Sequence, residues 1–585
     1  MIRILAKRIR QYMTQTVLTP VFVILEVVLE VIIPLFTANL IDFGIDAGNM
    51  QYVFKMGIAL LLSSFASLFF GVAAGRSSSI SSAGFARNLR DDMFANIQTF
   101  SFSNIDKFST ASIVTRLTTD VNNVQMAFMM LTRMAFRAPV MMIFSLIVSF
   151  GIDAKLSLIF IAALPVLAVG MYLIISRVHP VFERIFKTYD KLNGIVQENV
   201  RGIRVVKSFV REDYETQKFK KISGDIYRDF SGAEKVLALN MPLMQFCMYA
   251  CMLLISWFGA RAIIASGNNP DIGLSTGELM SLITYAMQIL MSLMMISMVF
   301  VMITISRASA ERIVELLSEK SNIVNPENPI ETLADGSIEF ENVGFFYSAK
   351  ADKACLSNIN LKIASGETVG IIGATGSSKS TLVQLIPRLY DASTGIVKVG
   401  GNDIKKYDLD VLRGGVAMVL QKNELFSGTI RDNLKWGNEN ASDEDIAEAS
   451  ASACADEFVS GFPKGYDTVI EQGGTNVSGG QKQRLCIARA LLKKPKILIL
   501  DDSTSAVDMK TDAKIRRALH QYLPKTTKII IAQRAASVKD ADKIIVMDDG
   551  QISDVGTHDE LMSRSGIYRE VYESQTRESE GDDNE

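Results

Sequence analysis

The chain has 585 residues, enough for several domains. Hydrophobic residues make up 48% of it and its formal net charge is only −2, so charge gives no reason to expect nucleic acid as a partner. Its five cysteines show no metal-site spacing, and Cys247 and Cys251, four residues apart in an apolar segment, are best explained as packing residues. These features argue against a nucleic-acid-binding protein and against a fold built on disulfides or metal.

Residues 1–320 contain six apolar stretches of membrane-spanning length. They lie near residues 16–41, 54–76, 134–152, 155–178, 237–265 and 277–305. Lys and Arg are concentrated between the second and third stretches and between the fourth and fifth. By the positive-inside rule, both of these segments and both termini lie on the cytoplasmic side of the cell membrane. The sequence therefore predicts an all-α membrane domain with six transmembrane helices.

The polar parts of this half are also predicted to be helical. Residues 80–133 and 180–235 are charged, periodic and nearly free of proline, which indicates that the spans continue as long helices into the cytoplasm. The basic, amphipathic N-terminus, MIRILAKRIRQYMTQ, predicts an elbow helix on the membrane surface. Its cations would face lipid phosphates; they are Arg3, Lys7, Arg8 and Arg10.

The pattern changes near residue 336. A linker at 321–335, with Pro326 and Pro329, precedes strand-like runs such as TVGIIG and KILILDD that alternate with helical segments. This alternation predicts an α/β domain with a largely parallel sheet over residues 336–573. The last residues, 574–585, are polar and acidic and are predicted to be a disordered tail.

A phosphate-binding loop follows the first of these strands. GATGSSKST comes after TVGIIG and before a helical segment, which is the context that such a loop requires. Backbone N–H groups would face phosphate oxygens, Lys379 would reach the outer phosphates, and Ser380 would hold Mg²⁺. The nucleotide-binding residues are then Gly373, Ala374, Thr375, Gly376, Ser377, Ser378, Lys379, Ser380 and Thr381. Glycine is usual at position 378, so serine there is strained if the backbone needs a positive φ.

Two aspartates and a second glycine-rich turn complete the pattern. Asp501 ends the buried strand ILILD and is predicted to hold Mg²⁺ together with Ser380, because Mg²⁺ sites use few carboxylates. Upstream, NVSGGQKQR (476–484) opens a helix with serine and two glycines. With VSGGQ just before the metal-binding strand, the sequence resembles the nucleotide-binding domain of ABC transporters. The resemblance covers essentially the whole chain and is closest to exporters of the multidrug type.

The resemblance implies roles for further residues. Tyr347 would stack on adenine, and Gln421 would sense Mg²⁺ and the attacking water. In this family two chains pair, and each ATP lies between the phosphate loop of one chain and the signature motif of the other. The residues that would complete the partner's site are Ser478, Gly479, Gly480 and Gln481, together with Asp508 in the loop that crosses to that site.

Three residues depart from the family pattern in this chain's own half-site. Asp502 stands where the family has a catalytic glutamate, Gln533 replaces the switch histidine, and Ser378 replaces a glycine. A shorter acid is displaced from the water, and displacements near 1 Å cost about a hundredfold in rate. Since the signature motif is intact, the chain resembles the degenerate-site subunit of a heterodimeric exporter of hydrophobic or amphipathic small molecules. The alternatives are an active homodimer exporting lipid or peptide and, less favoured, a regulatory subunit that binds ATP without hydrolysing it.

Candidate substrate contacts lie in the spans. Glu26 and Glu30 are four residues apart in the first span, where acids either face a substrate path that attracts cations or make polar contacts between helices. The sixth span is rich in methionine, and flexible thioethers suit a surface that accepts many shapes, although they are also ordinary packing residues. Its candidate substrate residues are Met291, Met295 and Met298.

Overall fold

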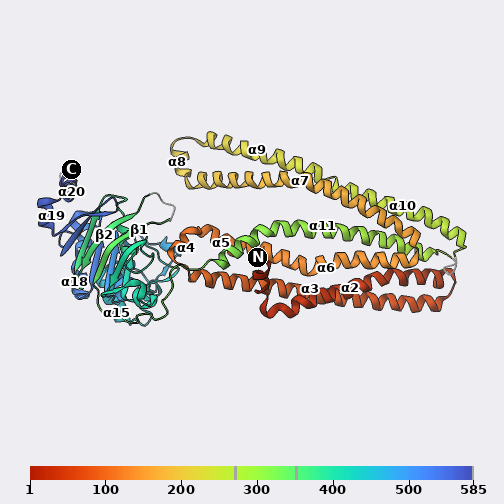
Figure 1. The fold of residues 1–585 in the computed structure, drawn as a ribbon, viewed down its shortest axis with the longest axis horizontal. Coiled ribbons are helices and arrows are strands. Elements are labelled where there is room, and N and C mark those ends of the chain that lie inside the picture. The colour runs from red at the N-terminus through yellow and green to blue at the C-terminus, as the bar shows by residue number, and fades with distance from the viewer. Residues whose placement is uncertain (269–272, 349–352, 583–585) are drawn as a thin grey trace. The chain divides into compact units, whose positions relative to one another are not determined.

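The computed structural model describes residues 1–268, 273–348 and 353–582 (Figure 1). The chain divides into two compact units. The first comprises Met1–Ile97 and Ala111–Glu319, and the second comprises Gln98–Thr110 and Lys320–Glu585. The division assigns the short segment around residue 104 to the second unit, although it interrupts the first unit in sequence.

The first unit is helical. Two of its helices, α3 and α5, each have one terminal residue, Gln98 and Thr110, that is assigned to the second unit. Its helices are α1 (Ile2–Ala6), η1 (Arg10–Tyr12), α2 (Met13–Leu40), η2 (Ile41–Asp46), α3 (Met50–Gln98), α5 (Thr110–Thr115), η3 (Arg116–Asp120), α6 (Val121–Ile152), α7 (Ala154–Arg201), α8 (Ile203–Ser208), α9 (Glu212–Leu237), α10 (Asn240–Ser266) and α11 (Thr276–Ser318). Helices α2, α6 and α11 pack together, and α7 packs against α9 and α10 (Figure 1).

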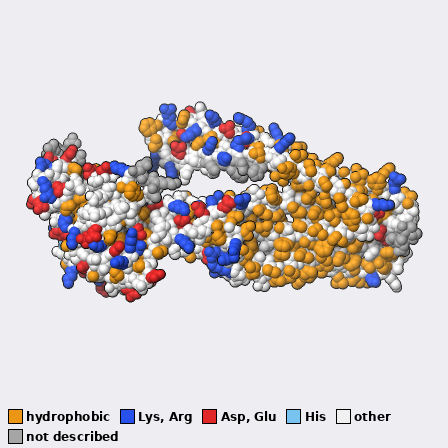
Figure 2. Space-filling model, in the orientation of Figure 1, with side chains coloured by type: hydrophobic (Ala, Val, Ile, Leu, Met, Phe, Trp, Pro, Cys, Tyr) orange, Lys and Arg blue, Asp and Glu red, His pale blue; other side chains and the backbone are white. Residues whose placement is uncertain are grey.

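Six helical segments in the described residues are long and apolar enough to cross a membrane, as the sequence predicts. Most of their apolar side chains are not buried inside the unit: within the most apolar window of the segment Met50–Gln98, none of the residues is buried. Figure 2 shows these side chains as a broad hydrophobic surface, with the charged side chains gathered beyond it. Such a surface is stable only in contact with lipid, so the chain is a multi-pass membrane protein.

Local signals fix where the helices begin and end. Asp153 caps the start of α7, since its carboxylate accepts hydrogen bonds from the backbone N–H groups of Lys155 (2.8 Å) and Leu156 (2.9 Å). This cap forms the short turn between the third and fourth predicted spans, 134–152 and 155–178. Similarly, α9 and α10 are separate helices that meet at Leu239, just before Pro242.

The polar extensions are helical as predicted, but the N-terminal prediction is wrong in part. Instead of facing lipid, Arg8 and Arg10 form ion pairs with Asp92 of α3, at 2.8 and 2.9 Å. The N-terminal helix α1 ends at Ala6. A carboxylate within reach provides a fixed partner for both guanidinium groups, which the amphipathic pattern of the N-terminus could not reveal.

The second unit contains two main sheets. A six-stranded sheet has the order β12-β11-β3-β10-β9-β6, parallel except for the edge strand β12, and an antiparallel sheet has the order β2-β1-β4-β5. The strands are β1 (Ile338–Phe345), β2 (Leu356–Ile363), β3 (Thr368–Gly373), β4 (Thr394–Val399), β5 (Asn402–Asp403), β6 (Val416–Val419), β7 (Gly428–Thr429), β8 (Val469–Ile470), β9 (Ile497–Asp501), β10 (Thr527–Ile531), β11 (Lys543–Asp548) and β12 (Gln551–Gly556).

The second unit also contains helices, several of which pack on the parallel sheet. They are α4 (Phe102–Lys107), α12 (Lys379–Gln384), α13 (Leu409–Gly415), α14 (Ile430–Lys435), α15 (Asp443–Ser452), α16 (Asp456–Val459), α17 (Gly479–Leu492), α18 (Met509–Tyr522), α19 (His558–Arg564) and α20 (Gly566–Asp582). Strands β9 and β10 are buried along their whole length, as expected of continuous aliphatic runs in a parallel sheet. The separate antiparallel sheet was not expected from the sequence.

Two segments are more ordered than their composition indicates. In the linker 321–335, Ile330 pairs with the loop at Lys406–Asp408 through two backbone hydrogen bonds, and Leu333 is buried. The acidic tail is not irregular, because α20 continues through Asp582; residues 583–585 lie outside the described residues. The buried Tyr568 anchors the start of this helix, and the prediction of disorder from composition alone is therefore wrong for 574–582.

Candidate nucleotide site

The topology of the parallel sheet brings the predicted ATP-site residues together. Strands β3, β10, β9 and β6 are neighbours, so the segments that leave their carboxyl ends meet at one edge of the sheet. The phosphate loop follows β3, Asp501 and Asp502 end β9, Gln533 follows β10, and Gln421 follows β6. Four stretches that are far apart in the sequence therefore form a single site.

The phosphate loop has the backbone of an anion cradle. Gly373 has a φ of 156° and Gly376 a φ of 87°; a Cβ at Gly373 would lie 2.2 Å from the carbonyl oxygen of Met547, which excludes any larger residue. The Lys379 ammonium donates hydrogen bonds to the carbonyl oxygens of Gly373 and Ala374, both at 2.8 Å. Burial lowers the pKa of Lys379. The lysine is thus held at the loop, where it can reach a phosphate.

Ser378 has the positive φ that the sequence left open. Its φ of 67° and ψ of 25° place it in the left-handed region, directly before α12. Glycine adopts this region freely, whereas serine has a Cβ that makes it unfavourable. The Ser378 hydroxyl lies 3.1 Å from the thiol sulfur of Cys355. The departure from glycine therefore introduces strain at the start of the helix that follows the loop.

Ser380 and Asp501 meet at the predicted metal position. The Ser380 hydroxyl donates a hydrogen bond of 2.9 Å to Oδ1 of Asp501, whose side chain is buried. Burial raises the pKa of the Asp501 carboxyl, although the hydrogen bond from Ser380 opposes this effect. A hydroxyl and a carboxylate are hard oxygen ligands that suit Mg²⁺, so the residues present fit that ion.

Asp502 is held by two glutamines. Its Oδ2 accepts a hydrogen bond of 2.7 Å from Nε2 of Gln533 and a long one of 3.5 Å from Nε2 of Gln421. Asp502 also has a positive φ of 49°, which aspartate tolerates better than most residues. Burial raises the pKa of its carboxyl more than the two amides lower it. All three predicted catalytic residues are therefore in contact.

Tyr347 lies beside the phosphate loop. Its hydroxyl is 3.0 Å from the hydroxyl of Thr381, and its ring packs edge-on against Tyr390 at 5.4 Å. About half of the side chain is exposed, at 53%. An aromatic face is thus available next to the loop, as stacking on a base requires.

The signature residues form a separate, exposed helix start. Ser478 caps α17, and Gln481 returns the contact through a capping box: its backbone N–H donates to the serine hydroxyl, and its side chain accepts from the backbone N–H of Ser478 at 2.9 Å. A Cβ at Gly480 would lie 2.9 Å from the carbonyl oxygen of Ala506, so glycine is required there. In the described part of the chain, no hydrogen bond joins Ser478–Gln481 to the phosphate loop.

Asp508 begins the next helix. It caps α18 by accepting a hydrogen bond of 2.9 Å from the backbone N–H of Thr511, which lowers the pKa of its carboxyl, and it remains exposed. It is therefore free to contact another molecule.

Sequence reasoning missed two contacts. The hydroxyl of Tyr390 donates a 2.6 Å hydrogen bond to Asp106, which joins α4 to the rest of the second unit. The second is Gln575 of α20, whose side chain bonds the backbone around Gln533. Neither belongs to a recognisable motif, and for Gln575 only its helical spacing from Tyr568 and Tyr572 was a signal.

In the membrane helices, the two predicted acids share one cation. Arg137 of α6 forms ion pairs with Glu26 at 2.8 Å and with Glu30 at 2.7 Å. Glu26 is buried between helices, and a Cβ at Gly71 of α3 would lie 2.9 Å from its carboxylate. Both acids therefore make polar contacts between helices, which is the second of the two explanations offered by the sequence.

The predicted methionines border a cavity. A cavity of about 190 Å³ is lined by Arg137, Met141, Met287, Gln288, Met291, Ser292 and Met295. Two of the three methionines predicted from the sixth span, Met291 and Met295, belong to this lining. Met298 is exposed but lies outside it.

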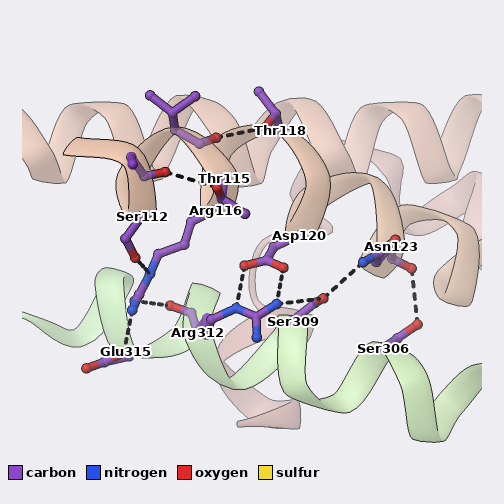
Figure 3. A network of polar contacts seen from close by, with 12 residues as sticks. Ser112, Thr115, Arg116, Thr118, Asp120, Asn123, Ser306, Ser309, Arg312 and Glu315 are labelled. Carbon is purple, nitrogen blue, oxygen red and sulfur yellow. Dashed lines mark hydrogen bonds and ion pairs between the residues drawn. The ribbon is translucent and has the colours of Figure 1, made fainter. Parts of the chain in front are cut away.

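An ionic network joins α6 and α11 beyond their apolar stretches (Figure 3). The buried Asp120 accepts hydrogen bonds from the guanidinium of Arg312, one of them at 2.7 Å. Arg116, in the π-helical turn η3, reaches back across to bond the Arg312 carbonyl oxygen and the Glu315 carboxylate, at 2.7 and 2.8 Å. The network ties the base of α11 to the segment that precedes α6.

Known proteins resemble the chain in both units. The family model described as "ABC transporter transmembrane region" matches residues 16–306, and the one described as "ABC transporter" matches residues 356–505. The chain is 35% identical over 555 residues to the uncharacterized ABC transporter ATP-binding protein YfiB of Bacillus subtilis (strain 168), covering 95% of each. It is 34% identical over 490 residues to the "probable multidrug resistance ABC transporter ATP-binding/permease protein YheI" of the same strain, covering 83% of this chain and 82% of YheI.

A solved structure has the same fold. It is described as that of a bacterial Atm1-family ABC exporter with ATP bound, and it matches with a TM-score of 0.77 at 23% identity. The match covers 98% of this chain and 99% of that one. The likeness therefore extends over the membrane helices as well as the nucleotide-binding domain.

Proposed function

Because the chain belongs to the ABC transporters, with a transmembrane region fused to an ATP-binding domain, we propose that it is one half of a heterodimeric ATP-driven exporter. In this proposal, ATP at the chain's own phosphate loop is hydrolysed slowly or not at all. Fast hydrolysis takes place on the partner's phosphate loop, which this chain completes with Ser478, Gly479, Gly480 and Gln481.

The contact between Asp502 and Gln533 carries the proposal. A general base needs a free oxygen within hydrogen-bonding reach of the water that it activates. Asp502 is one methylene shorter than glutamate, and one of its two carboxylate oxygens, Oδ2, already accepts a hydrogen bond from the amide of Gln533. Gln533 can donate a hydrogen bond to a γ-phosphate but carries no positive charge. This half-site is thus suited to holding ATP and poorly suited to cleaving it.

Other parts of the site support ATP binding with Mg²⁺. The positive-φ glycines, Lys379 and the hydroxyl–carboxylate pair Ser380–Asp501 are all in place. Bound Mg²⁺ would neutralise phosphate charge and orient the outer phosphates. Ser380 and Asp501 would hold the ion, with Gln421 nearby, and Tyr347 would offer its ring to adenine.

For the cargo we propose hydrophobic or amphipathic small molecules. The cavity is lined mainly by methionines, whose thioethers can adapt to many shapes, and its polar lining residues are Arg137, Gln288 and Ser292. The similarity to YheI, described as a probable multidrug resistance transporter, is consistent with this cargo. Met291 and Met295 are the residues that we assign to the substrate path, whereas Glu26 and Glu30 would act indirectly by fixing Arg137.

We also propose the orientation in the membrane. Both termini and the nucleotide-binding domain would lie in the cytoplasm of the cell; the basic segments between the second and third spans and between the fourth and fifth support this orientation. Closure of two nucleotide-binding domains around ATP would then bias the membrane helices toward an outward-facing state.

ATPase activity of the purified chain tests the proposal. The chain would be reconstituted in lipid without any partner. In parallel, it would be co-expressed with an ABC half-transporter encoded beside it, and the pair would be reconstituted in the same lipid. We expect activity only in the pair. Robust activity of the chain alone, abolished by Asp502→Asn, would establish an active homodimer instead. A pair that binds ATP but lacks ATPase activity would point to a regulatory subunit.

A further inference from the structure

The C-terminal helix reaches the switch loop of the nucleotide site through one side chain. Nε2 of Gln575 donates a hydrogen bond of 2.8 Å to the carbonyl oxygen of Gln533, and its Oε1 accepts one of 2.8 Å from the backbone N–H of Ala535. One amide thus bonds both backbone groups that flank Arg534. The donor and acceptor requirements fix the orientation of the amide, because the reversed orientation would oppose two acceptors and two donors.

The helix that presents Gln575 is firmly anchored. Tyr568 is fully buried, and its hydroxyl lies 2.8 Å from Nδ1 of His558; the ring of Tyr572 lies 4.9 Å from the same imidazole. Gln575 follows these tyrosines by seven and three residues, so all three lie on one face of α20. The face that packs on the domain core therefore ends at the switch loop.

The switch loop in turn contacts the catalytic acid. Strand β10 ends at Ile531, and two residues later the Gln533 side chain bonds Asp502 at 2.7 Å. The backbone of Gln533 is thus held by Gln575 on one side while its side chain enters the ATP site. A shift of the backbone would move the amide away from both Asp502 and a bound nucleotide.

We propose that Gln575 is a positioning residue that holds the switch loop so that Gln533 can contact the γ-phosphate of ATP. The inference rests on the proposed function to the extent that ATP binds this chain's own phosphate loop with Gln533 at its γ-phosphate. It goes further in assigning the acidic C-terminal segment a part in nucleotide recognition. Gln575 touches neither nucleotide nor Mg²⁺ in this scheme, and it acts only through Gln533.

The effect should depend on the γ-phosphate. We would measure binding of the β,γ-imido analogue of ATP and of ADP, each with Mg²⁺, to the full-length chain in lipid nanodiscs by titration calorimetry. Gln575→Ala is expected to raise the Kd of the ATP analogue about fivefold, the order of one net hydrogen bond, and to leave the Kd of ADP unchanged. Gln575→Glu, which keeps an acceptor but loses the donor, should weaken the ATP analogue selectively as well.

A mutant cycle separates positioning from general stability. Gln533→Ala should produce the same selective loss, and adding Gln575→Ala to it should change nothing further. Ser574→Ala, an exposed neighbour on the same helix, is the matched control and should bind both nucleotides as the unmodified chain does.

Two results would overturn the inference while leaving the proposed function intact. One is an equal loss of ATP-analogue and ADP binding in Gln575→Ala, which would show a purely structural role. The other is a γ-phosphate preference that Gln533→Ala abolishes and Gln575→Ala retains. If the unmodified chain binds both nucleotides with equal affinity, the γ-phosphate contact is absent and the inference fails, whereas the proposed function would fail only if the chain bound neither nucleotide.

Discussion

Ser378 shows how one residue can tune the phosphate loop. Its left-handed backbone, with a φ of 67°, costs a non-glycine residue about 1 to 3 kcal/mol. Glycine avoids this strain but loses more backbone entropy on folding. This entropy loss offsets part of the stability that glycine would gain over serine. The strain is local to the turn that cradles phosphate, so it affects the stability of the loop before it affects the rest of the domain.

We expect Ser378→Gly to stabilise the nucleotide-free protein by about 0.5 to 1 kcal/mol, because relief of the left-handed strain exceeds the added backbone entropy. Differential scanning calorimetry would follow the transition of the nucleotide-binding domain. Ser378→Ala is the control: it keeps the strained φ and removes the contact with Cys355, so its transition should not rise. Equal behaviour of the two variants would contradict the strain argument.

Restoring the family pattern at the acid and the switch should activate this half-site. We expect Asp502→Glu with Gln533→His to raise hydrolysis at the chain's own phosphate loop by about 10- to 100-fold, because the longer acid reaches the water and the imidazole can carry charge. Single-turnover hydrolysis of ATP by the chain alone would measure it. Rates that stay at the level of the unmodified chain would mean that the block lies elsewhere.

The raised pKa of Asp502 also predicts how the stability of the protein depends on pH. Burial raises the pKa of its carboxyl in the folded chain, so the unfolded chain loses this proton first. Its contribution to stability is therefore greatest at acidic pH and is lost as the pH rises from about 3.9, the ordinary value for aspartate, through the folded pKa. We expect Asp502→Asn to lose less stability between pH 4 and pH 7 than the unmodified chain. Thermal melts at several pH values in that range test this; parallel pH profiles would contradict it.

At the scale of elements, the network between η3 and α11 is asymmetric in burial. The Asp120 side chain is fully buried, whereas that of Arg312 is 45% exposed. Removing the arginine leaves a buried carboxylate without its cation, whereas removing the acid leaves an arginine that can turn to water. The same ion pair therefore gives two different costs, depending on which partner is lost.

We expect Arg312→Ala to destabilise the membrane domain by about 3 kcal/mol and Asp120→Ala by only about 1 kcal/mol. Thermal unfolding of the detergent-solubilised chain compares the two. Arg307→Ala is a useful control, since its pair with Glu311 is exposed and worth little. Equal losses of stability in Arg312→Ala and Asp120→Ala would contradict this argument. They would mean that water does not compensate Arg312 for the loss of Asp120.

At the scale of the whole molecule, the chain contributes two half-sites for ATP, and only one of them keeps the family pattern. Its own phosphate loop faces a short acid, whereas its signature motif has an intact cap and the glycine that its close contact requires. In a pair, each half contributes to a different ATP site. Substitutions in the two halves should therefore affect different events.

We expect Ser478→Ala in the co-expressed pair to reduce steady-state ATPase activity by more than tenfold, because the serine would contact ATP on the partner's loop, where hydrolysis is fast. Asp502→Asn should reduce it by less than twofold. Steady-state turnover in nanodiscs measures both, with Ser574→Ala as a neutral control. A larger loss from Asp502→Asn than from Ser478→Ala would reverse the assignment of the sites.

Much of this protein is determined by local sequence. Long apolar runs produce membrane helices because lipid leaves the backbone no other hydrogen-bonding partner, and buried aliphatic runs such as ILILD produce parallel strands. The phosphate loop could also be predicted from the sequence, because Gly373, Lys379 and Ser380 lie in one short continuous segment and form the loop with their sequence neighbours. For Ser378 the sequence supplied only the condition for strain, a positive φ, and the structure showed that this condition is met.

Other features depend on contacts between distant segments, and only the tertiary structure decided them. The sequence left two explanations open for Glu26 and Glu30, a substrate path or a contact between helices, until Arg137, 107 residues beyond Glu30, was found beside them. The hydrogen bond from Gln575 to the backbone of Gln533 joins residues 42 positions apart, and no sequence motif marks it. Periodicity and composition report what a segment does with its own neighbours; they do not report which distant side chain satisfies a buried charge or a loop carbonyl, because that depends on how the elements pack.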